Sequence, residues 1–199
     1  MRRFTSNCVF MILIGALLSG CGAGDKGPAE TALKAAEEAI NAAKGEASKY
    51  MPGQVASLDS ELAGLREKFN KGDFKAVVSE APALASKAKD VVNAAAAKKD
   101  ELTKAWSGFS AGFPKVVEAI KSRVDILSQS KKLPAGMTAE TLAGAKAGLA
   151  EITQQWTAAT DASKGGNLPD AMAKATALKA KAAEVLTTLK MPVPEALKA

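Results

Sequence analysis

Apolar residues recur every three or four positions over most of the chain after residue 28, which is the spacing of one face of an α-helix. Five clear stripes are Val55, Leu58, Leu62, Leu65 and Phe69; Phe74, Val77, Val78, Leu84, Val91 and Val92; Phe113, Val116, Val117, Ile120, Val124 and Leu127; Leu142, Leu149, Ile152 and Trp156; and Leu168, Met172, Val185, Leu186 and Leu189. A weaker, alanine-rich stripe with Leu33 and Ile40 predicts a helix over about 28–48. The pattern predicts an all-α bundle of about six helices.

Two short segments have the chemistry of tight helix-to-helix turns. In 71–74, Gly72 suits the end of one helix and Asp73 suits the N-cap of the next. In 165–168, Gly166 and Asn167 occupy the same places. We expect helical hairpins at both segments, and a further helix that begins at Thr138 and another whose first turn holds Pro114.

The two turns also indicate an internal repeat. When Gly72 is aligned with Gly166, several large apolar residues and one lysine coincide, namely Leu58 with Ile152, Leu62 with Trp156, Leu84 with Leu178, Lys87 with Lys181, and Val91 with Val185. The alignment favours two duplicated three-helix units. We expect them at 29–106 and 114–191, joined by a connector at 107–113 and followed by a tail at 192–199.

The first 20 residues follow a different pattern. Arg2 and Arg3 precede an apolar run over 8–18, and small residues close that run. This order is typical of a secretory signal peptide. A membrane-spanning helix needs about 20 apolar residues, roughly twice the length of this run.

The four residues Leu18-Ser19-Gly20-Cys21 resemble the lipobox of bacterial lipoproteins. The resemblance implies cleavage between Gly20 and Cys21, a diacylglycerol group on the Cys21 thiol, and a fatty acid such as palmitate on the new amine. Stable anchoring generally takes at least two acyl chains, which this modification supplies. Residues 21–28 would then be a flexible, Gly-rich tether. Gly22 after the cysteine implies an outer-membrane anchor facing the periplasm, and display at the cell surface stays open.

Removal of the signal peptide leaves little catalytic chemistry in the chain. Cys8 is lost and Cys21 is modified, so the mature domain has no free thiol and no disulfide. The sequence has no histidine, which is the commonest general base and a frequent metal ligand. We therefore expect no enzymatic activity, no catalytic residues, no metal site and no cofactor.

The positive charge of the chain does not resemble a nucleic-acid surface. Loss of Arg2 and Arg3 lowers the formal charge of +6 by two. Lysines are distributed over every predicted helix and are not interleaved with aromatic residues for base stacking. We expect no nucleic-acid partner, and only a mild, salt-sensitive attraction to anionic cell-wall polymers or lipid headgroups.

Three of the few aromatic residues, Trp106, Phe109 and Phe113, lie in the predicted connector beside Gly108 and Gly112. They are candidates either for filling the joint between the two units or for contacting a partner. The sequence thus favours a lipid-anchored binding or scaffolding module for an envelope protein or a cell-wall polymer. The alternative is a carrier of a lipid or another apolar ligand between the helix layers.

Overall fold

The computed structural model describes residues 25–197. Within this range the chain forms the six α-helices and one 3₁₀ helix listed here in order: α1 (Lys26–Lys44), α2 (Ala47–Tyr50), α3 (Pro52–Asn70), α4 (Phe74–Gln129), α5 (Ala139–Lys164), α6 (Leu168–Thr188) and η1 (Glu195–Leu197). The described range contains no strand, so the all-α prediction is confirmed. The predicted signal peptide, the predicted cleavage site between Gly20 and Cys21 and the predicted lipidation of Cys21 lie outside the described residues.

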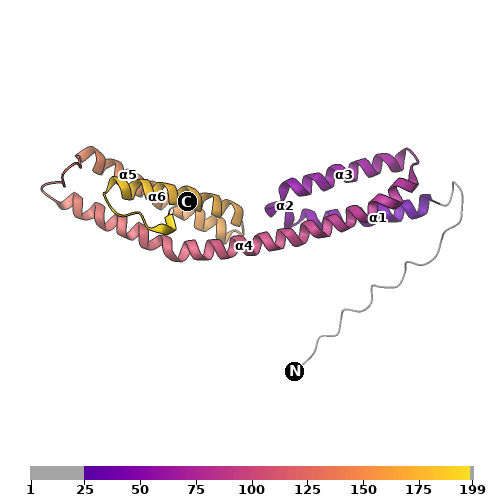
Figure 1. Cartoon of the computed structure of the whole chain (residues 1–199), viewed down its shortest axis with the longest axis horizontal. Helices are drawn as coiled ribbons and strands as arrows, with labels where there is room; N and C mark the ends of the chain where they lie inside the picture. The colour runs from indigo at the N-terminus through magenta and orange to yellow at the C-terminus, as the bar shows by residue number, and fades with distance from the viewer. Residues whose placement is uncertain (1–24, 198–199) are drawn as a thin grey trace, which may run out of the picture.

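Helix α4 runs the length of the molecule and contacts both groups of helices (Figure 1). It has 56 residues, which at a rise of 1.5 Å per residue gives a length of about 84 Å. Helices α1, α2 and α3 lie along its N-terminal half, and α5 and α6 lie along its C-terminal half (Figure 1). The result is an elongated molecule in which one helix belongs to two helical groups.

Each group has its own hydrophobic core. The first core is formed by α1–α3 and the first half of α4, with buried residues from Ala29 to Ala95. The second core is formed by the rest of α4 with α5, α6 and η1, with buried residues from Phe113 to Leu197. Alanine supplies many of the buried positions of the first core, including Ala29, Ala36, Ala43, Ala81, Ala88 and Ala95. Small side chains at these positions allow α1 and α4 to approach closely.

The predicted connector at 107–113 is not a break between helices, because these residues are part of α4 and continue its helix from one group to the other. Pro114 likewise lies inside α4 and does not begin a helix. The aromatic spacing explains the difference, since Trp106, Phe109 and Phe113 share one helical face. Phe113 is buried in the second core, and the other two rings pack against that core. This packing outweighs the poor helix propensity of the nearby glycines and proline.

The predicted boundaries at both ends of the domain also need correction. Lys26, Gly27 and Pro28 were expected in a flexible tether but form the first turn of α1, which is held by the buried Ala29. The first predicted helix ends at Lys44, and α2 follows as a separate turn. The tail folds back in part, because Leu197 in η1 is buried in the second core.

The two predicted hairpin turns are confirmed and have matching geometry. Gly72 and Gly166 both adopt a positive φ, +80° and +74°. The Asp73 carboxylate accepts a hydrogen bond from the Ala76 N–H, and the Asn167 side-chain oxygen accepts one from the Asp170 N–H, each at 3.3 Å. The backbone bonds that close the two turns match as well: Lys71, Gly72 and Asp73 donate to Glu67, Phe69 and Lys68, and Gly165, Gly166 and Asn167 donate to Asp161, Ser163 and Ala162.

Candidate functional site

The three aromatic residues singled out by the sequence meet a fourth, Trp156 of α5. The rings of Trp106 and Trp156 stack with centroids 5.8 Å apart and an interplanar angle of 19°. Phe109 and Phe113 lie 5.8 Å and 5.3 Å from the Trp156 ring, and 4.7 Å from each other. We call these four residues the aromatic cluster. Aromatic pairs at such distances stabilise beyond their buried area.

The members of the aromatic cluster differ in their access to solvent. Phe113 is only 2% exposed, so it offers no contact surface to a partner in this conformation. Trp106, Phe109 and Trp156 are half-buried and keep part of their rings at the surface. The Lys179 ammonium of α6 lies 6.0 Å from the Phe109 ring centroid, within cation–π range. The accessible part of the cluster is therefore an aromatic surface bordered by one positive charge.

The spacing of Trp156 in the stripe with Leu149 and Ile152 predicts a core position on its helix and does not relate it to the other three aromatic residues. The signal that was available is the spacing of the other three residues. Positions 106, 109 and 113 lie three and four residues apart, which puts them on one side of a continuous helix. That side faces the second core, where α5 also contributes Trp156.

A groove of about 450 Å³ lies between α3 and α4 in the first half of the molecule. Leu65 and Leu84 are among its apolar lining residues, and charged residues line it as well. Two ion pairs connect α3 to α4 there, Glu61 with Lys87 and Lys68 with Glu80. The hydrogen bond from Lys87, with a second one from Ser57, lowers the pKa of the Glu61 carboxyl. The groove is thus amphipathic.

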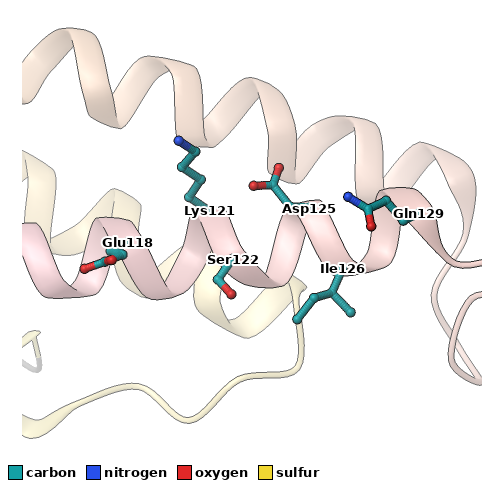
Figure 2. Close-up of a pocket in the computed structure, with 6 residues that line it drawn as sticks. All are labelled: Glu118, Lys121, Ser122, Asp125, Ile126 and Gln129. Atoms are coloured by element: carbon teal, nitrogen blue, oxygen red, sulfur yellow. The ribbon is translucent and has the colours of Figure 1, made fainter.

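A second depression, of about 330 Å³, lies on α4 towards its C-terminal end (Figure 2). Its lining residues all come from α4: Glu118, Lys121, Ser122, Asp125, Ile126 and Gln129. Ile126 is 57% exposed, and the other five side chains are polar or charged. A carrier of an apolar ligand needs an enclosed cavity with an apolar lining. Both of these depressions are instead lined in part by charged side chains.

Charge is divided unequally between the two halves of the chain. Residues 25–105 include 13 basic and 13 acidic residues, whereas residues 106–199 include 12 basic and eight acidic residues. Several basic residues of the first half form ion pairs between its elements, such as Lys44 with Asp59, Arg66 with Glu37, and Lys99 with Glu46. The surplus of positive charge therefore belongs to the half that carries α5 and α6.

Two further observations concern the described residues 25–197. This part of the chain contains no group of His, Cys, Asp and Glu residues arranged to hold a metal ion. None of its helices is both long enough and apolar enough to span a bilayer.

Comparison with known proteins leaves the family open. No family model matches the chain, and neither a curated protein nor a solved structure matches it. Any functional conclusion therefore depends on the residues and their geometry.

Proposed function

We propose that this chain is a lipid-anchored lipoprotein of the bacterial cell envelope that acts as a non-enzymatic binding or scaffolding module. The observation that carries the proposal is the lipobox-like segment 18–21, placed directly after the apolar run 8–18. The helical domain starts four residues after Cys21, with Asp25 and α1. An anchor at Cys21 would therefore attach to a folded domain through a very short tether.

This arrangement would fix which end of the molecule is near the membrane. Four residues span at most about 14 Å when fully extended. The start of α1 and the turn at 71–73 lie at one end of the molecule, and the loop at 130–138 lies at the other (Figure 1). The anchored chain would hold its first half close to the bilayer and present its second half at a distance set by α4.

The second half is also the part whose charge suits an acidic partner. Its surplus of basic residues includes Lys131 and Lys132, both exposed in the loop at 130–138. Complementary charge raises association rates and selects against basic partners. We propose that the partner is an acidic envelope protein or an anionic cell-wall polymer.

The anchor is tested by replacing Cys21 with Ser in cells grown with labelled fatty acid. We expect a precursor of uncleaved size that carries no acyl label, because the thiol is the acceptor. Cys8→Ser is the matched control, since it changes the chain's other cysteine and should leave cleavage and labelling intact. A Cys21→Ser product that is cleaved to mature size and still labelled would contradict the anchor.

The binding role is tested by photo-crosslinking in cells, with a probe at Trp106 or at Lys131. We expect the same protein or polymer adduct from both positions, and no adduct from a probe at the buried Phe113. Lipid adducts alone would support the carrier alternative and contradict the scaffold.

A further inference from the structure

The middle of α4 is the least buried part of that helix. Between Ala95 and Phe113, both buried, no residue of α4 is buried. On either side of this stretch a buried residue occurs every three to seven positions. The stretch therefore connects the two cores without belonging fully to either of them.

Its second part is also made of residues that weaken a helix. Gly108, Gly112 and Pro114 fall within two turns. Glycine inside a helix is unfavourable compared with alanine, and proline lacks the N–H that would bond to the Ser110 carbonyl. No steric requirement explains the glycines, because a Cβ atom at Gly108 or Gly112 would meet no atom within 4 Å. Departures from local helix preference of this kind are expected at functional sites.

The other proline inside α4 provides a contrast. Pro82 lies between the buried residues Ala81 and Leu84, in the half of α4 that α1 and α3 both contact. Any bend at Pro82 is held by packing from two helices. Pro114 follows the buried Phe113, but no residue of α4 between Ala95 and Phe113 is buried, and the partly buried Trp106 and Phe109 contact the second core alone.

Two contacts span the weak segment from the second half to the first. Trp156 of α5 stacks on Trp106, which precedes the glycines. Leu168, the first residue of α6, packs against the first core. A bend at 107–114 would separate the rings of Trp106 and Trp156. It would also strain the packing of Leu168 against the first core.

We propose that residues 107–114 of α4 form a hinge between the two halves of the molecule, and that the Trp106–Trp156 stack holds the hinge in the conformation of this structure as a latch. The hinge does not depend on the lipid anchor. In an anchored chain it would let the second half change its angle to the membrane while the first half stays in place.

The first test is hydrogen exchange measured by mass spectrometry on the full chain. We expect amides at 105–113 to exchange at least about tenfold faster than those at 84–95 and 116–127, because local opening needs less free energy where few residues are buried. The double variant Gly108→Ala/Gly112→Ala should slow exchange in this segment by about tenfold or more. Gly64→Ala and Gly144→Ala are matched controls, since both sites are helical and open to an added Cβ, and neither should change exchange at 105–113.

The second test uses the chain's two tryptophans. Their stack should give an exciton signal in circular dichroism that disappears in Trp106→Phe. The double alanine variant should increase this signal, and the two glycine controls should not. Equal exchange along α4 would overturn the hinge. Faster exchange that the alanines slow without any change in the tryptophan signal would overturn the latch.

Discussion

Gly148 of α5 packs directly against Val185 of α6, so closely that a Cβ atom on Gly148 would lie 2.6 Å from the Val185 Cγ2 atom. The contact brings the two helix backbones together in the second core. We expect Gly148→Ala to destabilise this core by about 1–3 kcal/mol, because the added methyl group must displace Val185 or the helix. Urea unfolding followed by circular dichroism measures the change.

Gly144→Ala is the control for this prediction. It lies one turn earlier on α5, and an added Cβ there meets no atom within 4 Å. Alanine should stabilise the helix at Gly144 by up to about 1 kcal/mol. If Gly148→Ala and Gly144→Ala had the same effect, the close approach of α5 and α6 would be wrong.

Because the turns at 71–74 and 165–168 have the same geometry, equivalent substitutions in them should lower the free energy of unfolding by similar amounts. Asp73→Ala and Asn167→Ala should each destabilise their own hairpin by about 1 kcal/mol, because each removes the side chain that caps the following helix. Gly72→Ala and Gly166→Ala should each cost about 1–2 kcal/mol, since both positions need a left-handed backbone. Chemical denaturation of the four variants tests this equivalence, which would fail if one turn tolerated changes that the other did not.

The two cores should respond independently to truncation. Leu84 and Leu178 occupy equivalent positions and are 5% and 0% exposed. Replacement of either by Ala should cost about 2–5 kcal/mol. Hydrogen exchange should locate the loss, with faster exchange in α1 and α3 for Leu84→Ala and in α5 and the end of α6 for Leu178→Ala. A uniform increase over the whole chain in both variants would show that the cores unfold as one.

The ion pair between Glu46 and Lys99 predicts a pH dependence. The hydrogen bond from Lys99, followed by its charge, lowers the pKa of Glu46 below the ordinary value of 4.5. A carboxyl group with a lowered pKa stabilises the fold above its ordinary pKa and loses this contribution as the pH falls through the lowered value. Both side chains are largely exposed, so the change in stability should be small.

Titration followed by NMR measures this pKa directly. Lys99→Met should return the pKa of Glu46 towards 4.5, whereas Lys104→Met on the same helix should leave it lowered. An unchanged pKa in Lys99→Met would mean that the pair does not form in solution.

The features that sequence could predict are those decided by neighbouring residues. The turns at 71–74 and 165–168 follow from one glycine and one capping side chain each, so their geometry is local. Helix stripes such as Val55, Leu58 and Leu62 likewise follow from spacing alone, and all three residues are buried. The continuity of α4 could not be read in this way. The local preferences of Gly108, Gly112 and Pro114 indicate a break, and only packing against α5 and α6 opposes it.

The candidate site was predictable to a smaller extent. The sequence groups Trp106, Phe109 and Phe113 by their spacing. Their arrangement depends on Trp156, which lies on a different helix, α5. The partial burial of Leu168 against the first core is also a consequence of the fold and has no sequence signal. Contacts of this type depend on which helices lie side by side.

The most direct test of the proposed function is the mass of the N-terminal peptide of the protein purified from its membrane fraction. We predict a peptide that begins at Cys21 and carries a diacylglyceryl group on sulfur and a fatty acid on the amine. A peptide that retains residues before Cys21, or one that begins at Cys21 with an unmodified thiol, would contradict the lipid anchor.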